Sequence, residues 1–278
     1  MPELPEVERA RQLAEEALAG RRIENILAPE DDKIFGPGGA AGVRRALTGR
    51  HVVKTARWGK YLWLELDRPP YPVIHLGMSG ALRVPGDDPV RLKSAPDPDR
   101  TGWPPRFWRC LIGTAASPGL CLTDPRRFSR VFLRACPPEE PPLSKLGADP
   151  LLAPLTGRVF AEHLRSRNAS VKSILLDQRF CPGIGNWLAD EILFQAGIDP
   201  RRPGCGLSHT EALRIRRKLL VILRRAVEAN ADDGKYPRSW LFHHRWARGG
   251  TGRGPNGVRL ERISIGGRTT AWAPTLQK

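Results

Sequence analysis

Hydrophobic and polar positions in the first half of the chain follow two periods. Between Val7 and Leu18 apolar residues recur at helical spacing, and Pro5 before them and Gly20 after them are typical of a helix start and stop. The chain then becomes rich in β-branched and aromatic residues with partial alternation, in runs at 51–66, 72–84, 106–115 and 119–135. Consecutive strands without helices between them predict an antiparallel β-sandwich or barrel after one leading helix.

The second half of the chain changes to helical spacing. Segments with this spacing lie at 158–167, 170–178, 186–197 and 208–230. The last of them opens with Ser208 and, three residues later, Glu211, which is a capping-box pattern. We therefore expect an α+β protein in which strands and helices are segregated along the chain.

Strand patterns return near the C-terminus, at 257–265 and 268–274, with Gly266 and Gly267 between them. This arrangement predicts a terminal β-hairpin, whereas the glycine-rich segment 250–257 is expected to be a flexible turn. A proline-rich stretch marks a boundary between domains. The predicted divisions are an N-terminal β-sandwich domain, a linker, a helical domain and a C-terminal hairpin region, at 1–136, 137–155, 156–230 and 231–278.

The charge of the chain indicates which class of partner it binds. The chain carries 45 Lys and Arg against 29 Asp and Glu, a formal net charge of +16. The excess is concentrated in the C-terminal half, where residues 235–278 contain nine basic side chains and one acidic one, Glu261. Because each neutralised phosphate releases counterions, such a surface favours a nucleic-acid partner. The alternative at this point is an arginine-rich protein without such a partner.

Other classes of protein are excluded by what the sequence lacks. No apolar run reaches the roughly 18 residues of a membrane span, and the acidic start is unlike a signal peptide, so we expect a soluble intracellular protein. The five cysteines are scattered without a Cys-x-x-Cys pair, and His243-His244 has no partner at metal spacing. Neither a disulfide framework nor a zinc site is expected, and no cofactor is predicted.

One candidate for chemistry is a glycine-rich helix start. Gly183 and Gly185 precede Asn186, which is expected to cap the helix, and the backbone N–H groups of such a turn point outward together. The sequence is therefore a candidate anion site, although a turn of this kind is more commonly only a turn. The basic helix at 208–230 that follows favours one wall of a nucleic-acid site.

A second candidate combines the sequence HLGMSG at 75–80 with DPRRF at 124–128. If Met78, Arg126 and Phe128 are exposed together, they can push into a base stack and fill the space that a flipped nucleotide leaves. The alternative is that Met78 and Phe128 are core residues.

The first residues raise a question that helix formation leaves open. Glu6 complements the positive end of the helix, but Pro2 and Glu3 stand before the helix and gain no role from it. Lys60 and His75 are equally open, because a lysine at a strand edge is commonly solvated and a histidine beside a strand is commonly structural.

Six motifs occur in one order over nearly the whole chain: MPELPEVE at the start, GKY at 59–61, HLGMSG, DPRRF, GIGNWLADEILF at 183–194 and GGRTTAW at 266–272. Together they resemble the formamidopyrimidine-DNA glycosylase family of bifunctional base-excision repair enzymes. The opening PELPE resembles that branch more than the endonuclease VIII branch, which typically begins Pro-Glu-Gly-Pro-Glu. The resemblance implies a β-sandwich, a helix–two-turn–helix module and a β-hairpin finger, acting as a monomer on damaged double-stranded DNA.

The resemblance also implies roles for particular residues. Once Met1 is removed, Pro2 is the nucleophile that forms a Schiff base at C1′, and Glu3 is the acid or base that protonates the opening sugar. Glu6 supports this active site, and Lys60 belongs to the catalytic group as well. Phosphates around the extruded nucleotide are held by Lys60, His75, Asn186 and Arg268, and the gap in the duplex is filled by Met78, Arg126 and Phe128. An α-amino group suits this chemistry because its pKa of about 8 lies about two units below that of lysine.

Two departures from the family pattern change the expectations. Many bacterial members carry a four-cysteine zinc finger, but this chain has no cysteine after Cys205, so its end resembles the zincless finger of plant-type members. Apolar contacts are expected to replace the metal, from Trp240, Phe242, Trp246 and Trp272. Only the short segment 231–239 separates the basic helix from Trp240. We therefore expect weak activity on 8-oxoguanine and better activity on formamidopyrimidines, hydantoins and abasic sites.

Alternatives within this resemblance stay open. One is a glycosylase of the endonuclease VIII type that prefers oxidised pyrimidines, since lesion choice depends on the shape of the pocket. Another is a non-catalytic nucleic-acid-binding protein on the same scaffold, which would have no need of Pro2 and Glu3. Strand cleavage by β- or by β,δ-elimination is equally open, and the compartment is that of the DNA, a bacterial nucleoid or a eukaryotic nucleus.

Overall fold

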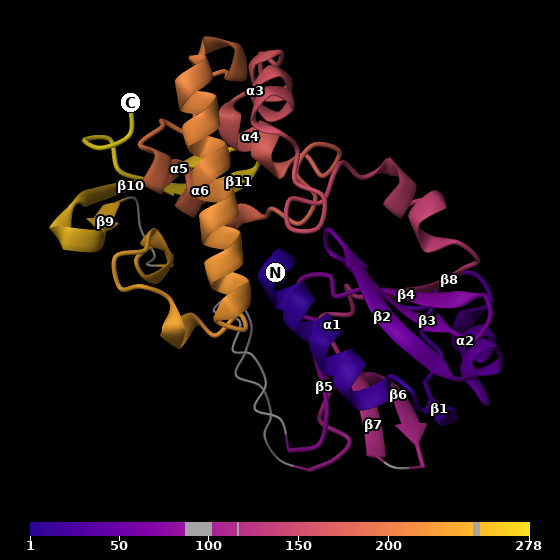
Figure 1. Cartoon of the computed structure of the whole chain (residues 1–278). Coiled ribbons are helices and arrows are strands. Elements are labelled where there is room, and N and C mark those ends of the chain that lie inside the picture. The colour runs from indigo at the N-terminus through magenta and orange to yellow at the C-terminus, as the bar shows by residue number, and fades with distance from the viewer. Residues whose placement is uncertain (87–101, 116, 247–250) are drawn as a thin grey trace. The chain divides into compact units, whose positions relative to one another are not determined.

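The computed structural model describes residues 1–86, 102–115, 117–246 and 251–278 (Figure 1). The chain forms two compact units, Met1–Lys145 (unit 1) and Leu146–Lys278 (unit 2). The division between them falls within 137–155, the segment that the sequence assigns to a linker. The finer division into four segments stays a prediction.

Unit 1 contains two four-stranded antiparallel sheets, with strand orders β1-β6-β7-β5 and β2-β3-β4-β8. The strands are β1 (Ile23–Leu27), β2 (Val52–Trp58), β3 (Tyr61–Leu66), β4 (Tyr71–His75), β5 (Ala81–Arg83), β6 (Trp108–Thr114), β7 (Ser117–Thr123) and β8 (Arg130–Arg134). The helices of this unit are α1 (Leu4–Leu18) and α2 (Gly39–Leu47). The antiparallel β-sandwich predicted from the sequence is confirmed.

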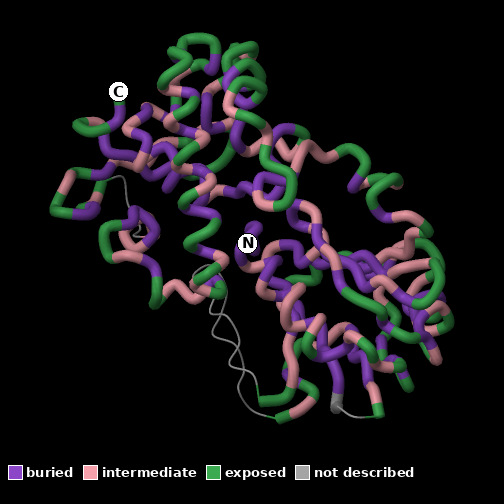
Figure 2. Tube along the Cα trace, viewed as in Figure 1, coloured by how far each residue is buried: buried purple, intermediate pink, exposed green. Residues whose placement is uncertain are grey.

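One hydrophobic core joins both sheets to α1 (Figure 2). It contains Leu64 of β3 and Ile112 of β6 together with Ala14 and Leu18 of α1. Burying a large apolar side chain stabilises a fold by roughly 1.5–3 kcal/mol, so this core fixes the axis of α1 against the sandwich. The start of the helix, and with it the first residues of the chain, is thereby held in a defined place in unit 1.

Unit 2 begins with four helices, and each lies where helical spacing predicted one. They are α3 (Gly157–Arg165), α4 (Val171–Leu176), α5 (Asn186–Ala196) and α6 (His209–Glu228). The predicted capping box of α6 is confirmed, because Ser208 N donates to Glu211 Oε2 at 2.8 Å and Glu211 N donates to Ser208 Oγ at 3.2 Å. The described residues also form short 3-10 turns, η1 (Pro137–Glu139), η2 (Leu143–Lys145), η3 (Gly204–Gly206), η4 (Asp233–Lys235), η5 (Leu241–His243) and η6 (Pro255–Gly257).

Unit 2 ends in an antiparallel sheet of β9 (Thr251–Arg253), β10 (Arg259–Ile265) and β11 (Arg268–Trp272), in the order β11-β10-β9. The predicted hairpin is confirmed: β10 and β11 are joined by Gly266 and Gly267, whose φ angles of 56° and 72° suit glycine. The expectation of a flexible turn at 250–257 is wrong for Thr251–Arg253, because these residues pair with β10 and their backbone groups are used in the sheet.

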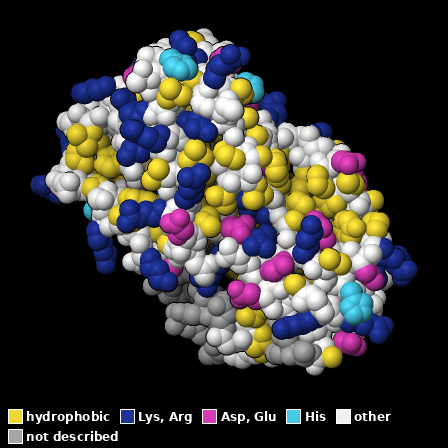
Figure 3. Space-filling model, viewed as in Figure 1, with side chains coloured by type: hydrophobic (Ala, Val, Ile, Leu, Met, Phe, Trp, Pro, Cys, Tyr) yellow, Lys and Arg dark blue, Asp and Glu magenta, His cyan; other side chains and the backbone are white. Residues whose placement is uncertain are grey.

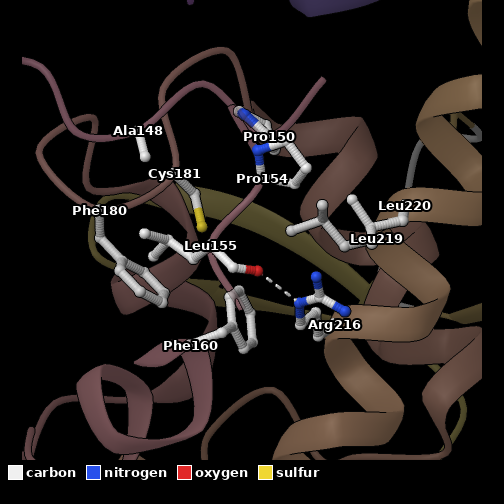
Figure 4. A pocket seen from close by; sticks show the side chains of 10 residues that line it. All are labelled: Ala148, Pro150, Pro154, Leu155, Phe160, Phe180, Cys181, Arg216, Leu219 and Leu220. Atoms are coloured by element: carbon white, nitrogen blue, oxygen red, sulfur yellow. Dashed lines mark hydrogen bonds between the residues drawn. The ribbon is translucent and has the colours of Figure 1, made fainter. Parts of the chain in front are cut away.

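A small apolar pocket lies in unit 2 between α3 and α6 (Figure 4). Phe160, Phe180 and Leu219 are among the residues that line it, and Arg216 Nε donates to the carbonyl of Leu155 at 2.8 Å on its rim. No helix of the described residues combines the length and the apolar character needed to cross a membrane.

Candidate active site

The start of the chain lies among ionisable groups of unit 1. Pro2 and Glu3 are both buried. The pKa of the Met1 amine is lowered, chiefly because the amine is removed from water. The charged groups that act on it are Glu3, Glu6, Lys60 and Arg126. The structure therefore brings several of the predicted site residues together around the first residues of the chain.

Glu6 has the properties of an acid or base that works near neutral pH. Burial and, to a smaller extent, the neighbouring carboxylate of Glu3 raise the pKa of Glu6 to about 7. The Glu6 carboxylate accepts a hydrogen bond from Glu3 N at 2.9 Å, which places it at the first turn of α1. A carboxyl group with this pKa can hold or release a proton at physiological pH.

Lys60 lies in the tight turn between β2 and β3. The turn contains only Gly59 and Lys60, since Trp58 pairs with Tyr61, and the φ of Gly59 is 59°. Lys60 is 8% exposed, so the interpretation of a solvated lysine at a strand edge is wrong. Its ammonium group is held in the interior near the first residues of the chain.

A buried ion pair joins this turn to α1. Arg57 Nε donates to Glu8 Oε2 at 2.9 Å, and the same guanidinium donates to the carbonyl of Gly59 at 3.1 Å. Arg57 thereby connects the helix that carries Glu3 and Glu6 to the turn that carries Lys60. Sequence reasoning missed this connection, because it depends on two residues that are far apart in the chain.

His75 ends β4 beside Tyr61, whose ring centroid lies 4.7 Å from that of the imidazole. Burial, together with the charges of Lys60 and Arg130, lowers the pKa of His75 to about 4. Gly77 N donates to His75 Nδ1 at 3.1 Å, so the proton of the neutral ring is on Nε2. His75 is therefore a neutral donor at physiological pH, suited to a phosphate oxygen.

The two sequences HLGMSG and DPRRF meet in space. The φ of Gly77 is 63°, and a Cβ at this position would lie 2.3 Å from the carbonyl oxygen of Phe128. Phe128 is 43% exposed and the Arg126 guanidinium lies 5.0 Å from its ring centroid, so the interpretation of Phe128 as a core residue is wrong. Met78 is half-buried. The turn that carries Met78 and the turn that carries Arg126 and Phe128 are thus in contact.

Asp124 organises both turns and was missed at the sequence level. Its Oδ1 accepts from Ser79 Oγ at 2.6 Å and from Arg126 N at 3.1 Å. Its Oδ2 accepts from Phe128 N at 2.7 Å and from Ser129 N at 2.6 Å. The available signal was an aspartate at the first position of an Asp-Pro turn, where a side chain commonly accepts from nearby backbone N–H groups.

In unit 2, the helix start at Asn186 differs from the expectation. Asn186 is the first residue of α5 and Gly185 is its cap, so the prediction of Asn186 as the capping residue is wrong. The reason is a competing partner: Asn186 Nδ2 donates to the carbonyl of Thr269 in β11 at 2.9 Å. Arg268, the exposed residue before Thr269, is therefore held next to the N-terminus of α5. The two phosphate-binding candidates of unit 2 lie together.

The loop before α5 is shaped by Gln178, which sequence reasoning also missed. Gly183 N donates to Gln178 Oε1 at 3.0 Å, and Gln178 Nε2 donates to the carbonyl of Ile184 at 2.9 Å. The φ of Gly183 is 93°, which suits glycine. Backbone N–H groups of such a loop and helix start favour an anion.

Lys and Arg side chains are spread over the face of unit 2 in view in Figure 3.

Aromatic residues pack near the hairpin region. Phe242 contacts Trp246, with ring centroids 5.5 Å apart, and Tyr236 connects Phe242 to Trp240. Trp272 is also buried, with the guanidinium of Arg201 4.3 Å from its ring centroid. Within the described residues, no group of three or more His, Cys, Asp or Glu side chains is placed to hold a metal ion.

Comparisons with known proteins match nearly the whole chain. Residues 1–131 match the protein-family model of the formamidopyrimidine-DNA glycosylase N-terminal domain, and residues 146–236 match that of the formamidopyrimidine-DNA glycosylase H2TH domain. A formamidopyrimidine-DNA glycosylase of Arabidopsis thaliana is 37% identical over 278 residues, which cover 100% of this chain and 71% of the relative. One of Moorella thermoacetica is 34% identical over 276 residues, with 97% and 89% covered.

A solved structure is similar over the whole chain. It is the crystal structure of Lactococcus lactis formamidopyrimidine-DNA glycosylase bound non-covalently to DNA that contains an AP site. It is 25% identical in sequence, with a TM-score of 0.79, and the match covers 99% of each chain.

Proposed function

The chain belongs to the formamidopyrimidine-DNA glycosylase family, and we propose that Pro2 is the residue with which it attacks damaged DNA. The protein is a DNA glycosylase of base-excision repair that also has the lyase activity of its family, and its partner is DNA. The observation that carries the proposal for Pro2 is the setting of the chain start, buried among Glu3, Glu6 and Lys60.

The proposed reaction begins after Met1 has been removed. The secondary amine of Pro2 attacks C1′, the bond from C1′ to the damaged base breaks, and the base leaves with a proton. Glu3 gives a proton to the sugar ring oxygen as the ring opens, which leaves a cationic Schiff base between Pro2 and C1′. That cation acidifies C2′–H, and loss of the proton expels the 3′ phosphate by β-elimination.

Burial supports the choice of this amine. The pKa of the Met1 amine is lowered because burial disfavours its charged form, and Pro2 is itself buried. An amine at the same place is neutral, and therefore nucleophilic, in a larger fraction of molecules at pH 7 than an exposed one. Glu6, with a pKa of about 7, receives or returns the protons that the amine and Glu3 exchange.

The remaining candidates hold the substrate. Lys60 and His75 bind the phosphates beside the extruded nucleotide, one as a cation and one as a neutral donor. In unit 2, Asn186 and Arg268 bind phosphates at the start of α5. Met78, Arg126 and Phe128 fill the space that the nucleotide leaves.

Borohydride trapping tests the role of Pro2. Processed protein is incubated with a duplex that contains one abasic site, and a covalent adduct is expected. The adduct is expected to be lost when Met1 is retained, because the Pro2 nitrogen is then an amide, and to be kept in processed Pro5→Ala, which changes a proline in the same region of the chain. An adduct of unchanged yield in the protein that retains Met1 refutes the role of Pro2. No adduct with processed wild-type protein favours a non-catalytic DNA-binding protein instead.

We propose further that the enzyme prefers formamidopyrimidines, hydantoins and abasic sites and acts weakly on 8-oxoguanine. The support is the short connection between α6, which ends at Glu228, and Trp240, part of which is the turn η4. Excision rates on matched duplexes test this preference. Excision of 8-oxoguanine opposite cytosine at the rate of formamidopyrimidine excision contradicts it, and faster excision of an oxidised pyrimidine favours the endonuclease VIII type.

We also propose that the enzyme is a monomer that needs no metal, because the aromatic residues Tyr236, Trp240, Phe242 and Trp246 supply the packing of the C-terminal region. Prolonged treatment with a strong zinc chelator is expected to leave trapping and the elution volume of the protein unchanged. Loss of trapping that added zinc restores contradicts the proposal. Association with DNA follows from the activity, and the compartment stays a prediction.

A further inference from the structure

Three charged side chains form a buried cluster in unit 2, outside the residues discussed above. Lys172 of α4 and Asp190 of α5 have fully buried side chains, and Lys172 Nζ lies 2.6 Å from Asp190 Oδ1. Arg245, whose side chain is 6% exposed, donates from Nη2 to Asp190 Oδ2 at 2.8 Å. Removing charges from water is costly, and buried ion pairs are commonly no more stabilising than apolar residues of the same size. The cluster therefore calls for a role other than stability.

The cluster binds the backbone of β11 at two places. Lys172 Nζ donates to Thr270 Oγ1 at 2.7 Å and to the carbonyl of Thr269 at 3.3 Å. Asp190 Oδ2 also accepts from Ala271 N at 3.2 Å. Lys172 and Asp190 therefore bind the same strand segment at Thr269 and at Ala271, which fixes its position along α5, because a shift by one residue would reverse which side chains face the helix.

The carbonyl that Lys172 binds is the same one that Asn186 binds. Asn186 Nδ2 donates to Thr269 O at 2.9 Å, and Arg268 precedes Thr269 directly. Directly before Arg268 the hairpin turns through Gly266 and Gly267. The placement of the Arg268 guanidinium relative to Asn186 thus depends on the anchoring of β11.

We propose that Lys172, Asp190 and Arg245 are positioning residues that fix β11 against α5, so that Arg268 and Asn186 bind phosphates of the same DNA strand at once. This inference rests on the proposed phosphate-binding role of Arg268 and Asn186.

The test is the salt dependence of binding to a duplex with a stable abasic-site analogue. Losing one phosphate contact lowers the slope of log Kd against log salt concentration by about 0.9. Arg268→Ala is expected to show this decrease. The apolar variant Lys172→Met/Asp190→Leu/Arg245→Met is expected to show a decrease of the same size, and to cause no further decrease when combined with Arg268→Ala. If a variant is only less stable, the molecules that remain folded bind DNA with the wild-type slope of log Kd against log salt concentration.

The control variant is Arg165→Met, which removes the same net charge from unit 2. Arg165 lies in α3, and its Nε donates to the carbonyl of Leu207 at 2.8 Å. Its slope is expected to equal that of the wild type. If the triple variant fails to fold, Lys172→Met/Asp190→Asn leaves an amide oxygen for Ala271 and Arg245, and the same decrease is expected.

The outcomes separate the inference from its premise. A folded cluster variant with the wild-type slope overturns the inference, as does a decrease that adds to that of Arg268→Ala. An unchanged slope in Arg268→Ala itself refutes the phosphate-binding role on which the inference rests, whatever the cluster variants do.

Discussion

Replacing Asp124 by Asn is expected to destabilise unit 1 and to weaken the wedge at the same time. The change keeps the size of the side chain and removes one charge. Asp124 is fully buried, and its two oxygens accept four hydrogen bonds, from Ser79, Arg126, Phe128 and Ser129. The effect therefore measures these bonds and not a cavity.

The magnitude follows from which bonds an amide can keep. If the amide oxygen stays at the Oδ2 position, the bonds from Phe128 N and Ser129 N survive. The NH₂ group can then donate to the hydroxyl of Ser79, but it faces Arg126 N, where two donors meet. One bond to a charged acceptor is lost, at about 1.5–3 kcal/mol, and three weaken to neutral strength. Relief from burying a charge offsets part of this, so we expect a net loss of about 3 kcal/mol.

Urea unfolding at pH 7 measures the loss, with Glu30→Gln as the control. Glu30 pairs with Arg44 at the surface, where their side chains are 61% and 38% exposed, so its loss is expected to stay below about 1 kcal/mol. The pKa of Asp124 is lowered in the folded protein, although burial opposes the hydrogen bonds that lower it. Its contribution is therefore present above the unfolded pKa of about 3.9 and is lost as the pH falls below it, so wild type and Asp124→Asn should converge in acid.

The same variant reports on the wedge. Fluorescence of 2-aminopurine next to an abasic-site analogue rises when the neighbouring base is unstacked, and a smaller rise is expected for folded Asp124→Asn than for the wild type. Equal stability losses in Asp124→Asn and Glu30→Gln, with an unchanged fluorescence signal, would refute the reasoning that Asp124 holds both turns.

Three further predictions follow from groups near the chain start. The pKa of Glu6 is raised to about 7, so its contribution to stability is present below the unfolded pKa and is lost as the pH rises through 7. Between pH 5 and pH 8 the wild type should therefore lose up to about 3 kcal/mol of stability that Glu6→Gln does not lose. The trapping rate of Glu6→Gln should also lack the change with pH that the wild type shows near pH 7. Lys60→Ala should lower the slope of log Kd against log salt concentration by about 0.9. His75→Ala should weaken DNA binding and leave this slope unchanged, because His75 is neutral. Equal slopes in the two variants contradict this assignment. Gly77→Ala should abolish the fluorescence signal of base unstacking, since its Cβ would lie 2.3 Å from Phe128 O, and a wild-type signal would show that the two turns separate freely.

Periodicity predicted most of the regular structure because the elements bury one face each. Helix α6 and the hairpin β10–β11 have strong local patterns and local end signals, and both were found. Strand β1 and helix α2 were missed because the local signal of each is weak. β1 pairs with β6, far along the chain, and α2 starts with Gly39 and contains a second glycine, Gly42, both of low helix propensity, so tertiary packing decides both.

The residues of the candidate site show the same difference between local and long-range signals. Pro2, Glu3, Lys60 and Arg268 could be named from motifs because each supplies a chemical group that the reaction or DNA needs. Asp124, Arg57 and Lys172 act through other residues, and their partners become neighbours only in the fold. The prediction that Asn186 caps α5 was wrong for the same reason, since its side chain binds a strand far along the chain.

The central claim, that the chain start is the reagent, is tested most directly by locating the trapped adduct. Processed protein is cross-linked to an abasic-site duplex with borohydride, digested with protease and nuclease, and sequenced by tandem mass spectrometry. The account predicts the sugar remnant on the nitrogen of Pro2, in the peptide that begins with that residue. A remnant on Lys60 or on any other lysine would contradict it.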